Sequence, residues 1–231
     1  MDHNACILFL FLESIYRYEP GLYDKIKQGV CYKFKNKKEL QKAVNEWCIS
    51  KYEHTHKTAK EQYGHISIWD TSRITDMSEL FSIKFEFNDN INGWDISRVT
   101  DLSYMFNRCS KYNHPLNNWD TKNVINMEGL FSCCDIFNSD IDGWDVSSVI
   151  NMECMFHECF KFNKSLNKWD VSNVINMKFM FYDCKVFNQC LDKWDVGSVF
   201  NMIYMFTGCR EFNQPLDVWD VSGITNLELM F

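Results

Sequence analysis

The sequence has little of what keeps a chain unfolded, with only three prolines in 231 residues. Disordered segments are typically rich in proline and poor in aromatic residues. Here aromatic residues make up 16% of the chain and hydrophobic residues 46%. We therefore expect a packed globular core, and the length alone allows one or two domains.

Long hydrophobic runs are also scarce. The apolar run at residues 5–12 has eight residues, far short of the roughly 20 that cross a bilayer. A signal peptide would have a positively charged start, whereas the only early charge is Asp2. We expect no membrane span and a cytoplasmic, intracellular protein. The run is expected to be a buried helix packed on residues 14–30, or else a segment that touches a membrane or a partner.

Positive charge is lacking in most of the chain. Residues 1–63 carry 11 basic and 8 acidic side chains, but residues 64–231 carry 13 and 23. Nucleic-acid binding needs clustered Lys and Arg, so nucleic acid is not an expected partner. Catalytic motifs are missing too: there is no glycine-rich phosphate loop, nucleophile elbow or zinc-protease motif. The sequence predicts no enzyme and no cofactor.

What the chain does have is a repeat. Self-similarity at one fixed period indicates stacked repeats. A WD40 propeller is excluded because each of its blades needs about 40 to 45 residues. The repeat is marked by seven Trp-Asp pairs spaced 25 residues apart, at Trp69, Trp94, Trp119, Trp144, Trp169, Trp194 and Trp219.

Two periods coexist in each 25-residue unit. Trp144 and Val146 alternate with polar residues, which is typical of a short strand. Asn151 then stands where an N-cap would begin a helix. Spacings of three and four residues, typical of one helix face, separate Met152, Met155, Phe156 and Cys159. The sequence predicts an α/β repeat: a leucine-rich-repeat-like solenoid of seven 25-residue coils, each with a short strand and a short helix.

The chain divides into three predicted segments. Residues 1–36 have no assignable role and are expected to be helical. Residues 37–63 read as a helical cap, with Leu40, Val44 and Trp47 of one helix on one face and a second helix ending at Gly64. A solenoid needs such a cap to stay soluble. Residues 64–231 form the solenoid, with an incomplete last coil.

Two polar columns recur in the repeat. The aspartates that follow each tryptophan are expected to accept the N–H two residues on, in Asx-turns; a calcium ladder is the alternative. The second column is expected to be an asparagine ladder that satisfies turn backbone groups. It comprises Asn88, Asn113, Asn138, Asn163, Asn188 and Asn213.

Eleven cysteines invite a disulfide or metal interpretation. Free cysteine, however, behaves as a small buried hydrophobe, and without a signal peptide reduced thiols are the default. We expect no metal; the nearest candidates for a zinc site are Cys133–Cys134, Cys154 with Cys159, and Cys48 with His54 and His56. One column of the repeat is cysteine in five coils: Cys109, Cys134, Cys159, Cys184 and Cys209.

Residues 64–231 resemble the BspA-like leucine-rich-repeat family. The resemblance is carried by the runs Trp169 to Val174, Asn176-Met177, Met205-Phe206 and Phe212 to Leu216, and by Cys209. This family includes surface proteins of mycoplasmas and other bacteria, with similar arrays in protists and large DNA viruses. The resemblance implies a solenoid with a binding or surface role and no catalytic residues. If the source were viral, the host cytoplasm would be the expected location.

Function is expected to come from positions that vary. One outward column of the predicted helices carries Tyr104, Phe179, Tyr204 and Leu229, and exposed aromatic residues are enriched at interfaces. We expect a non-catalytic module that binds a protein partner through these four residues. The alternative is a structural or surface-adhesion protein. The last coil stops at Phe231, and end-to-end self-association through this end is a further expectation.

Overall fold

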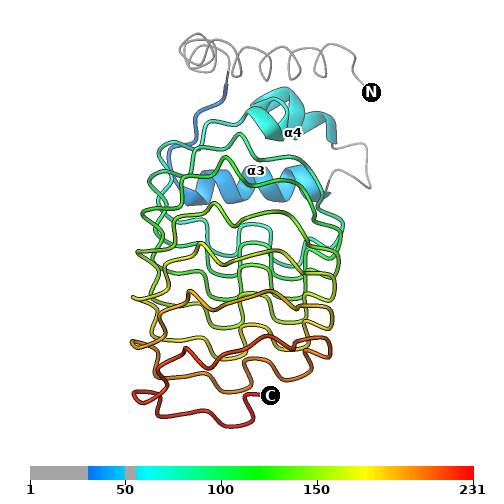
Figure 1. The fold of residues 1–231 in the computed structure, drawn as a ribbon. Coiled ribbons are helices and arrows are strands. Elements are labelled where there is room, and N and C mark those ends of the chain that lie inside the picture. The colour runs from blue at the N-terminus through cyan, green and yellow to red at the C-terminus, as the bar shows by residue number, and fades with distance from the viewer. Residues whose placement is uncertain (1–30, 50–55) are drawn as a thin grey trace.

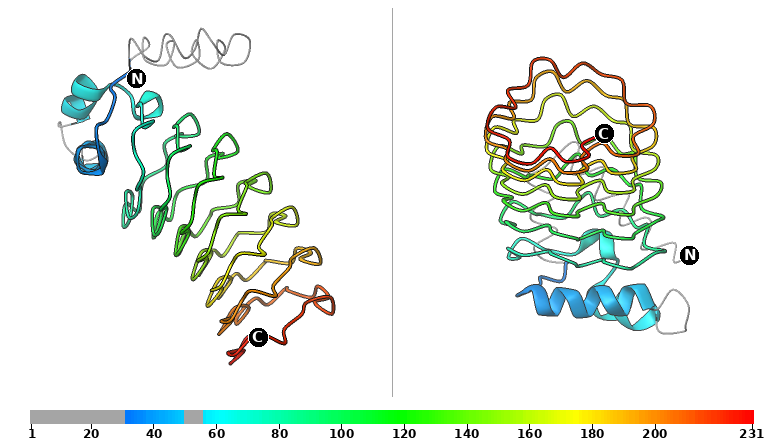
Figure 2. Two further views of the ribbon diagram at one scale, coloured as in Figure 1. Left: turned by 90° about the vertical axis from the view of Figure 1, so that its left-hand side faces the viewer. Right: turned by 90° about the horizontal axis from the view of Figure 1, so that it is seen from below.

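The structure, a computed structural model, describes residues 31–49 and 56–231. Two helices lie at one end, and the rest of the described chain winds into coils placed one upon another (Figure 1). Seen edge-on, the coils follow one another in sequence order (Figure 2). We call residues 64–231 the coil stack. The expectations for residues 5–12 and 14–30, and those that involve His54, lie outside the described residues.

The helices form where the sequence supplies a cap and an apolar face. Helix α3 (Lys37–Ile49) begins after Asn36, whose side-chain oxygen accepts the Glu39 N–H at 3.0 Å. Its buried residues are Leu40, Ala43, Val44 and Trp47. Helix α4 (His56–Tyr63) ends at Gly64, which has a φ of 75° and donates its N–H to the Lys60 carbonyl. Gly64 is therefore the left-handed residue that the sequence predicted. Beyond these helices, a single turn of 3-10 helix, η1, spans Ile66–Ile68.

The predicted α/β solenoid of strand-and-helix coils is wrong. Within the coil stack the structure has neither an α-helix nor a strand; beyond η1 it has turns and one isolated parallel bridge between successive coils. The bridges join the column that was expected to cap helices, from Asp76 to Asn226. These side chains accept the N–H two residues on, as Asn151 does from Glu153 at 3.0 Å. They form Asx-turns, not helix caps.

A different hydrogen-bond pattern replaces the helix. In the first coil Glu79 and Phe81 donate their N–H groups to the next coil, at Ser103 and Met105. The alternate N–H groups close turns within the coil, as Ser82 does to Glu79 at 2.9 Å. A helix would satisfy every one of these donors internally, whereas the coil stack directs half of them to a neighbour. The left-handed backbone positions recur after four residues, as at Glu79 and Ile83, and the turns bury the same side chains that a helical spacing does.

The predicted strand fails for a related reason. The Trp144 and Val149 N–H groups close turns, to Ile141 and Val146, and so form no ladder with the next coil. Ile150 and Asn151 both donate their N–H groups to the Ile125 carbonyl of the preceding coil, at 2.9 and 3.5 Å. Bonds confined to this one point of the coil give an isolated bridge and no sheet.

The core is a set of parallel ladders that run through the stack. Phe131, Phe156 and Phe181 stack with ring centroids 5.9 and 5.6 Å apart. Each later tryptophan donates its indole N–H to a carbonyl 28 residues earlier, as Trp144 does to Leu116 at 3.0 Å. The cysteine column does the same with its thiols, since the Cys159 Sγ lies 2.9 Å from the Phe131 oxygen. The column is thus structural: Cys109, Cys134, Cys159 and Cys184 are buried, Cys209 is partly buried, and none of the five forms a disulfide.

The two polar columns behave as the sequence predicts. The Asp145 carboxylate accepts the Ser147 N–H at 3.0 Å, and the other tryptophan-linked aspartates make the equivalent bond. The Asn138 side-chain oxygen accepts the Asn163 N–H at 3.0 Å, and this ladder continues between neighbouring coils. Both columns satisfy backbone donors that turns leave open.

Helix α3 lies where a preceding coil would stand. No coil precedes the first one, so its carbonyls lack the backbone N–H donors that an earlier coil would supply. The Gln41 side chain donates to one of these carbonyls, that of Leu80, at 2.9 Å. The Trp47 indole donates to Asp89 at 3.0 Å, and Lys37 pairs with Asp76 at 2.8 Å. These contacts cover one end of the stack. The segment boundaries at residues 36 and 63 stay a prediction.

Candidate interaction surface on the turns

Two residues of each turn segment have left-handed backbones, four residues apart. We call them the first and second turn columns. A left-handed conformation costs a residue other than glycine about 1–2 kcal/mol, yet each column contains a single glycine. The first turn column is Glu79, Tyr104, Gly129, Cys154, Phe179, Tyr204 and Leu229. The second is Ile83, Arg108, Cys133, Glu158, Asp183 and Gly208.

All four predicted contact residues lie in the first turn column. Leu229 in the last coil is 57% exposed, whereas Tyr104, Phe179 and Tyr204 are half-buried. The column follows the stack one residue per coil, so Phe179, Tyr204 and Leu229 stand on three successive coils. Tyr104 lies three coils before Phe179. The structure therefore places the residues on one face but does not gather all of them at one point.

An aromatic cluster forms where the column is richest in rings. Phe179 and Tyr204 stack with centroids 5.0 Å apart and planes 2° from parallel. Tyr182 packs edge-on against Phe179 at 5.5 Å and stacks on His157 at 4.9 Å. The Lys178 ammonium lies 5.1 Å above the Phe179 ring, within cation–π reach. We call His157, Phe179, Tyr182 and Tyr204 the aromatic cluster.

Tyr104 is held differently, through Gly129 in the next coil. A Cβ added to Gly129 would lie 2.3 Å from the Tyr104 Cε1, so the ring covers the glycine. The Tyr104 hydroxyl donates to Glu128 at 2.5 Å. Burial, followed by this hydrogen bond, raises the pKa of Tyr104 well above its ordinary value. Tyr104 is the most firmly seated of the four candidates.

Acidic side chains connect Tyr104 to the aromatic cluster. Asn151 donates to Glu128 at 3.0 Å, and Asn176 donates to Glu153 at 2.9 Å. Lys178 pairs with Glu153 at 3.4 Å. The face thus combines aromatic rings with hydrogen-bonded carboxylates, of which Glu128 forms no ion pair with another described residue.

Sequence analysis missed part of this surface. His157 and Tyr182 each precede a residue of the second turn column by one position. Aligning the repeats at a period of 25 puts the two in one column, and this column lies beside Phe179. An exposed apolar stripe was also not predicted. Aligning the repeats at a period of 25 shows it as one position of the repeat, which is Thr75 and Thr100 in the first two coils and apolar in the next four. The stripe is 40–46% exposed and consists of Ile125, Ile150, Ile175 and Phe200.

Three metal-ligating side chains of different kinds meet next to the aromatic cluster. The ligand atoms of Cys133, His157 and Glu158 all lie within 4.8 Å of one another. Burial raises the pKa of the Cys133 thiol and lowers the pKa of His157. The imidazole is therefore neutral at neutral pH, the form that binds metals. Of the zinc candidates weighed from sequence, this group contains only Cys133.

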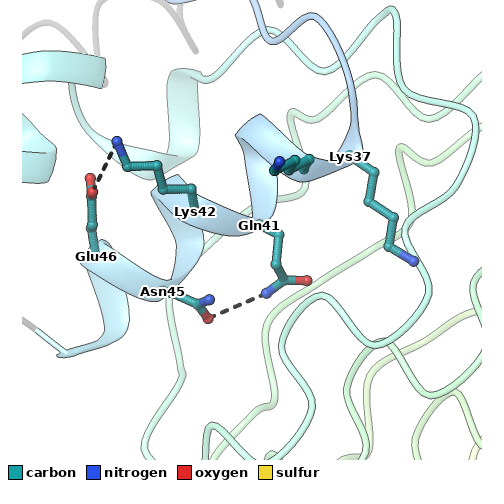
Figure 3. A pocket seen from close by; sticks show the side chains of 6 residues that line it. Lys37, Gln41, Lys42, Asn45 and Glu46 are labelled. Atoms are coloured by element: carbon teal, nitrogen blue, oxygen red, sulfur yellow. Dashed lines mark hydrogen bonds and ion pairs between the residues drawn. The ribbon is translucent and has the colours of Figure 1, made fainter.

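A hollow beside α3 is the other concave feature. It is lined by Lys37, Gln41, Lys42, Asn45 and Glu46 (Figure 3). Lys42 pairs with Glu46 at 3.7 Å, and Gln41 donates to Asn45 at 3.3 Å. Lys37 is also paired, with Asp76, whereas Lys38, which lines the hollow too, forms no ion pair with another described residue.

Comparison with known proteins gives a family but no activity. The family model described as "Mycoplasma protein of unknown function, DUF285" matches residues 50–166 and 125–231. The chain belongs to this family. No curated protein and no solved structure matches it. For the DUF285 chain, no helix among residues 31–49 and 56–231 is long and apolar enough to cross a membrane.

Proposed function

We propose that this DUF285 chain is a non-catalytic protein-interaction module that binds a protein partner through its turn face. The contact residues are Tyr104, Phe179, Tyr204 and Leu229, joined by His157 and Tyr182. The observation that carries the proposal is the stacked pair Phe179–Tyr204, two rings held at left-handed positions.

The backbone explains why these rings are informative. At a left-handed position glycine relieves strain of about 1–2 kcal/mol. The stacking of Phe179 on Tyr204 returns about 0.5–1.5 kcal/mol beyond the burial of the two half-buried rings. A bulky aromatic at such a position is better explained by binding, because aromatic residues supply most of the energy at interface hot spots.

Charge indicates the kind of partner. The coil stack carries ten more acidic than basic side chains, and Glu128 and Glu153 flank the first turn column. We therefore propose a partner surface that presents Arg or Lys beside apolar side chains. Arginine suits both halves of this face, since it pairs with carboxylates and stacks on rings.

The test is affinity capture from the native cell with two forms of the chain. One is intact, and the other carries Tyr104→Gly, Phe179→Gly and Tyr204→Gly. Glycine is preferred to alanine because alanine would keep the backbone strain while removing the ring. We expect a partner to be held by the intact chain and lost with the triple variant.

A matched control comes from the same column. Glu79→Gly makes the same backbone change without removing a ring, and Glu79 is exposed. This variant should retain the partner. Equal capture by the triple variant, or loss with Glu79→Gly as well, would contradict the assignment of the aromatic residues.

The second candidate is a structural or surface-adhesion protein that acts through copies of itself or on host surfaces. The exposed stripe of Ile125, Ile150, Ile175 and Phe200 favours it, since contiguous apolar surface marks interaction sites. Membership of a BspA-like group within the DUF285 family would also favour this second candidate. Sedimentation at high concentration separates the candidates: self-association reduced by Ile150→Asp and Ile175→Asp supports adhesion, and a strict monomer counts against it.

A further inference from the structure

Three unlike metal ligands meet only once among the described residues, where Cys133 and Glu158 of the second turn column lie beside His157. The same column has Arg108 on the coil before Cys133 and Asp183 on the coil after Glu158. Between these coils, a thiol, an imidazole and a carboxylate lie within 4.8 Å of one another. The thiol belongs to Cys133, and the other two groups are adjacent in the next coil, at His157 and Glu158.

The backbone fixes this arrangement before any ligand is present. The Cys133 N–H bonds to the His157 carbonyl at 2.7 Å, which aligns the two coils at this point. Glu158 donates its own N–H to Tyr182, also at 2.7 Å. Cys133 and Glu158 both have left-handed backbones, with φ of 56° and 57°. Their side chains therefore project in parallel from neighbouring coils.

The side chains are positioned to meet a common ion. The Cys133 Sγ lies 3.6 Å from the Glu158 Oε2. Ligands around a tetrahedral zinc, at about 2.0 to 2.3 Å from the metal, are separated by roughly 3.3 to 3.6 Å. The His157 ring is oriented by stacking on Tyr182, and within residues 31–49 and 56–231 neither of its nitrogens has a hydrogen-bond partner. All three ligand atoms lie within 4.8 Å of one another.

We propose that Cys133, His157 and Glu158 bind a Zn²⁺ ion, with water as the fourth ligand. Mixed sulfur, nitrogen and oxygen donors suit a borderline-soft divalent ion and disfavour Mg²⁺ or Ca²⁺, which take oxygen ligands. The thiol releases its proton to solvent as the metal–sulfur bond forms. Three protein ligands leave one coordination position open.

The site goes beyond the proposed partner binding and does not rest on it. It adjoins the aromatic cluster through His157, which stacks on Tyr182 and lies edge-on to Phe179 at 6.1 Å. A bound cation would also offset the negative charge of the adjacent Glu158 and Asp183 carboxylates. Neither carboxylate forms an ion pair with another described residue.

The experiment uses the metal-free full chain, titrated with Zn²⁺ by calorimetry and with Co²⁺ by absorption spectroscopy. We expect one Zn²⁺ per chain and a sulfur-to-cobalt charge-transfer band with tetrahedral ligand-field absorption. Cys133→Ser should abolish the charge-transfer band. His157→Gln and Glu158→Gln should each weaken Zn²⁺ binding more than about tenfold, because even loss of an outer-shell partner costs 10- to 100-fold.

Matched controls change the same residue types elsewhere. Cys190→Ser and His114→Gln should leave the Zn²⁺ affinity unchanged, since neither residue lies in the cluster. Cys133→Gly is a second thiol variant that relieves the left-handed backbone, so its loss of metal binding cannot be attributed to misfolding. Absence of stoichiometric binding, or binding that survives all three ligand substitutions, would overturn the proposal.

Discussion

The inward and outward residues of each turn share one backbone but follow different rules. Inward, Phe131, Phe156 and Phe181 repeat almost without change and stack on one another. Outward, the first turn column passes from Glu79 to Tyr204 through residues of every class. The inward ladders define the coil, because each ring is packed by identical neighbours. The outward columns are free to vary, and chemistry specific to this chain must therefore lie there.

Removing an inward ring should have the largest effect. Phe156 is fully buried and packs against Phe162 at 4.1 Å and Phe181 at 5.6 Å. Phe156→Ala leaves a cavity between coils that repetitive packing cannot collapse, so we expect a loss of about 3–5 kcal/mol. Equilibrium unfolding in urea measures this. A loss below about 1 kcal/mol would mean that the ladders do not hold the coils together.

A smaller effect should follow from a contact within the outward residues, between Gly129 and Tyr104 of the first turn column. Gly129→Ala puts a Cβ into the Tyr104 ring and a side chain at a φ of 57°, which should cost about 1–3 kcal/mol. The clash should disappear in a Tyr104→Gly background, where only the backbone strain remains.

Gly143→Ala is the matched control, because a Cβ there meets nothing within 4 Å. It should change the free energy of unfolding little. Equal losses for Gly129→Ala with and without Tyr104 would show that the ring does not occupy the position described.

The aspartate column should have a still smaller effect, and one that depends on pH. The Ser147 hydroxyl, followed by the Ser147 N–H, holds the pKa of Asp145 below its ordinary value. A lowered folded-state pKa adds stability above the unfolded pKa of about 3.9, and this contribution is lost as the pH falls through the folded pKa. Unfolding at pH 7 and pH 3 should show a smaller acid loss for Asp145→Asn than for the intact chain. Identical losses would contradict this role of the carboxylate.

Sequence reasoning recovered the side-chain directions better than the backbone. The period, the buried positions such as Met152 and Cys159, and the Asx-turns of Asp145 and its equivalents were all predicted. The helix and strand were wrong, because apolar spacing shows which side chains face inward and not where the N–H groups bond. A backbone whose left-handed positions recur after four residues and a helix of 3.6 residues per turn bury the same positions over two turns.

The candidate surface shows the same limit. Tyr104, Phe179, Tyr204 and Leu229 were found as one varying column, but the left-handed backbone of that column was not. Gly129 was the available signal, since a lone glycine in a varying column indicates a left-handed position. The grouping of His157 with Cys133 depends on which residues neighbour each other between coils, and the bonds that align the coils fix this.

The most direct test of the account is the free energy of unfolding of the triple variant Tyr104→Gly, Phe179→Gly and Tyr204→Gly, measured beside Phe156→Ala. We expect the triple variant to stay within about 1 kcal/mol of the intact chain, because relief of left-handed strain offsets the lost contacts. A loss as large as that of the single substitution Phe156→Ala would contradict the account, because the outward rings would then belong to the fold.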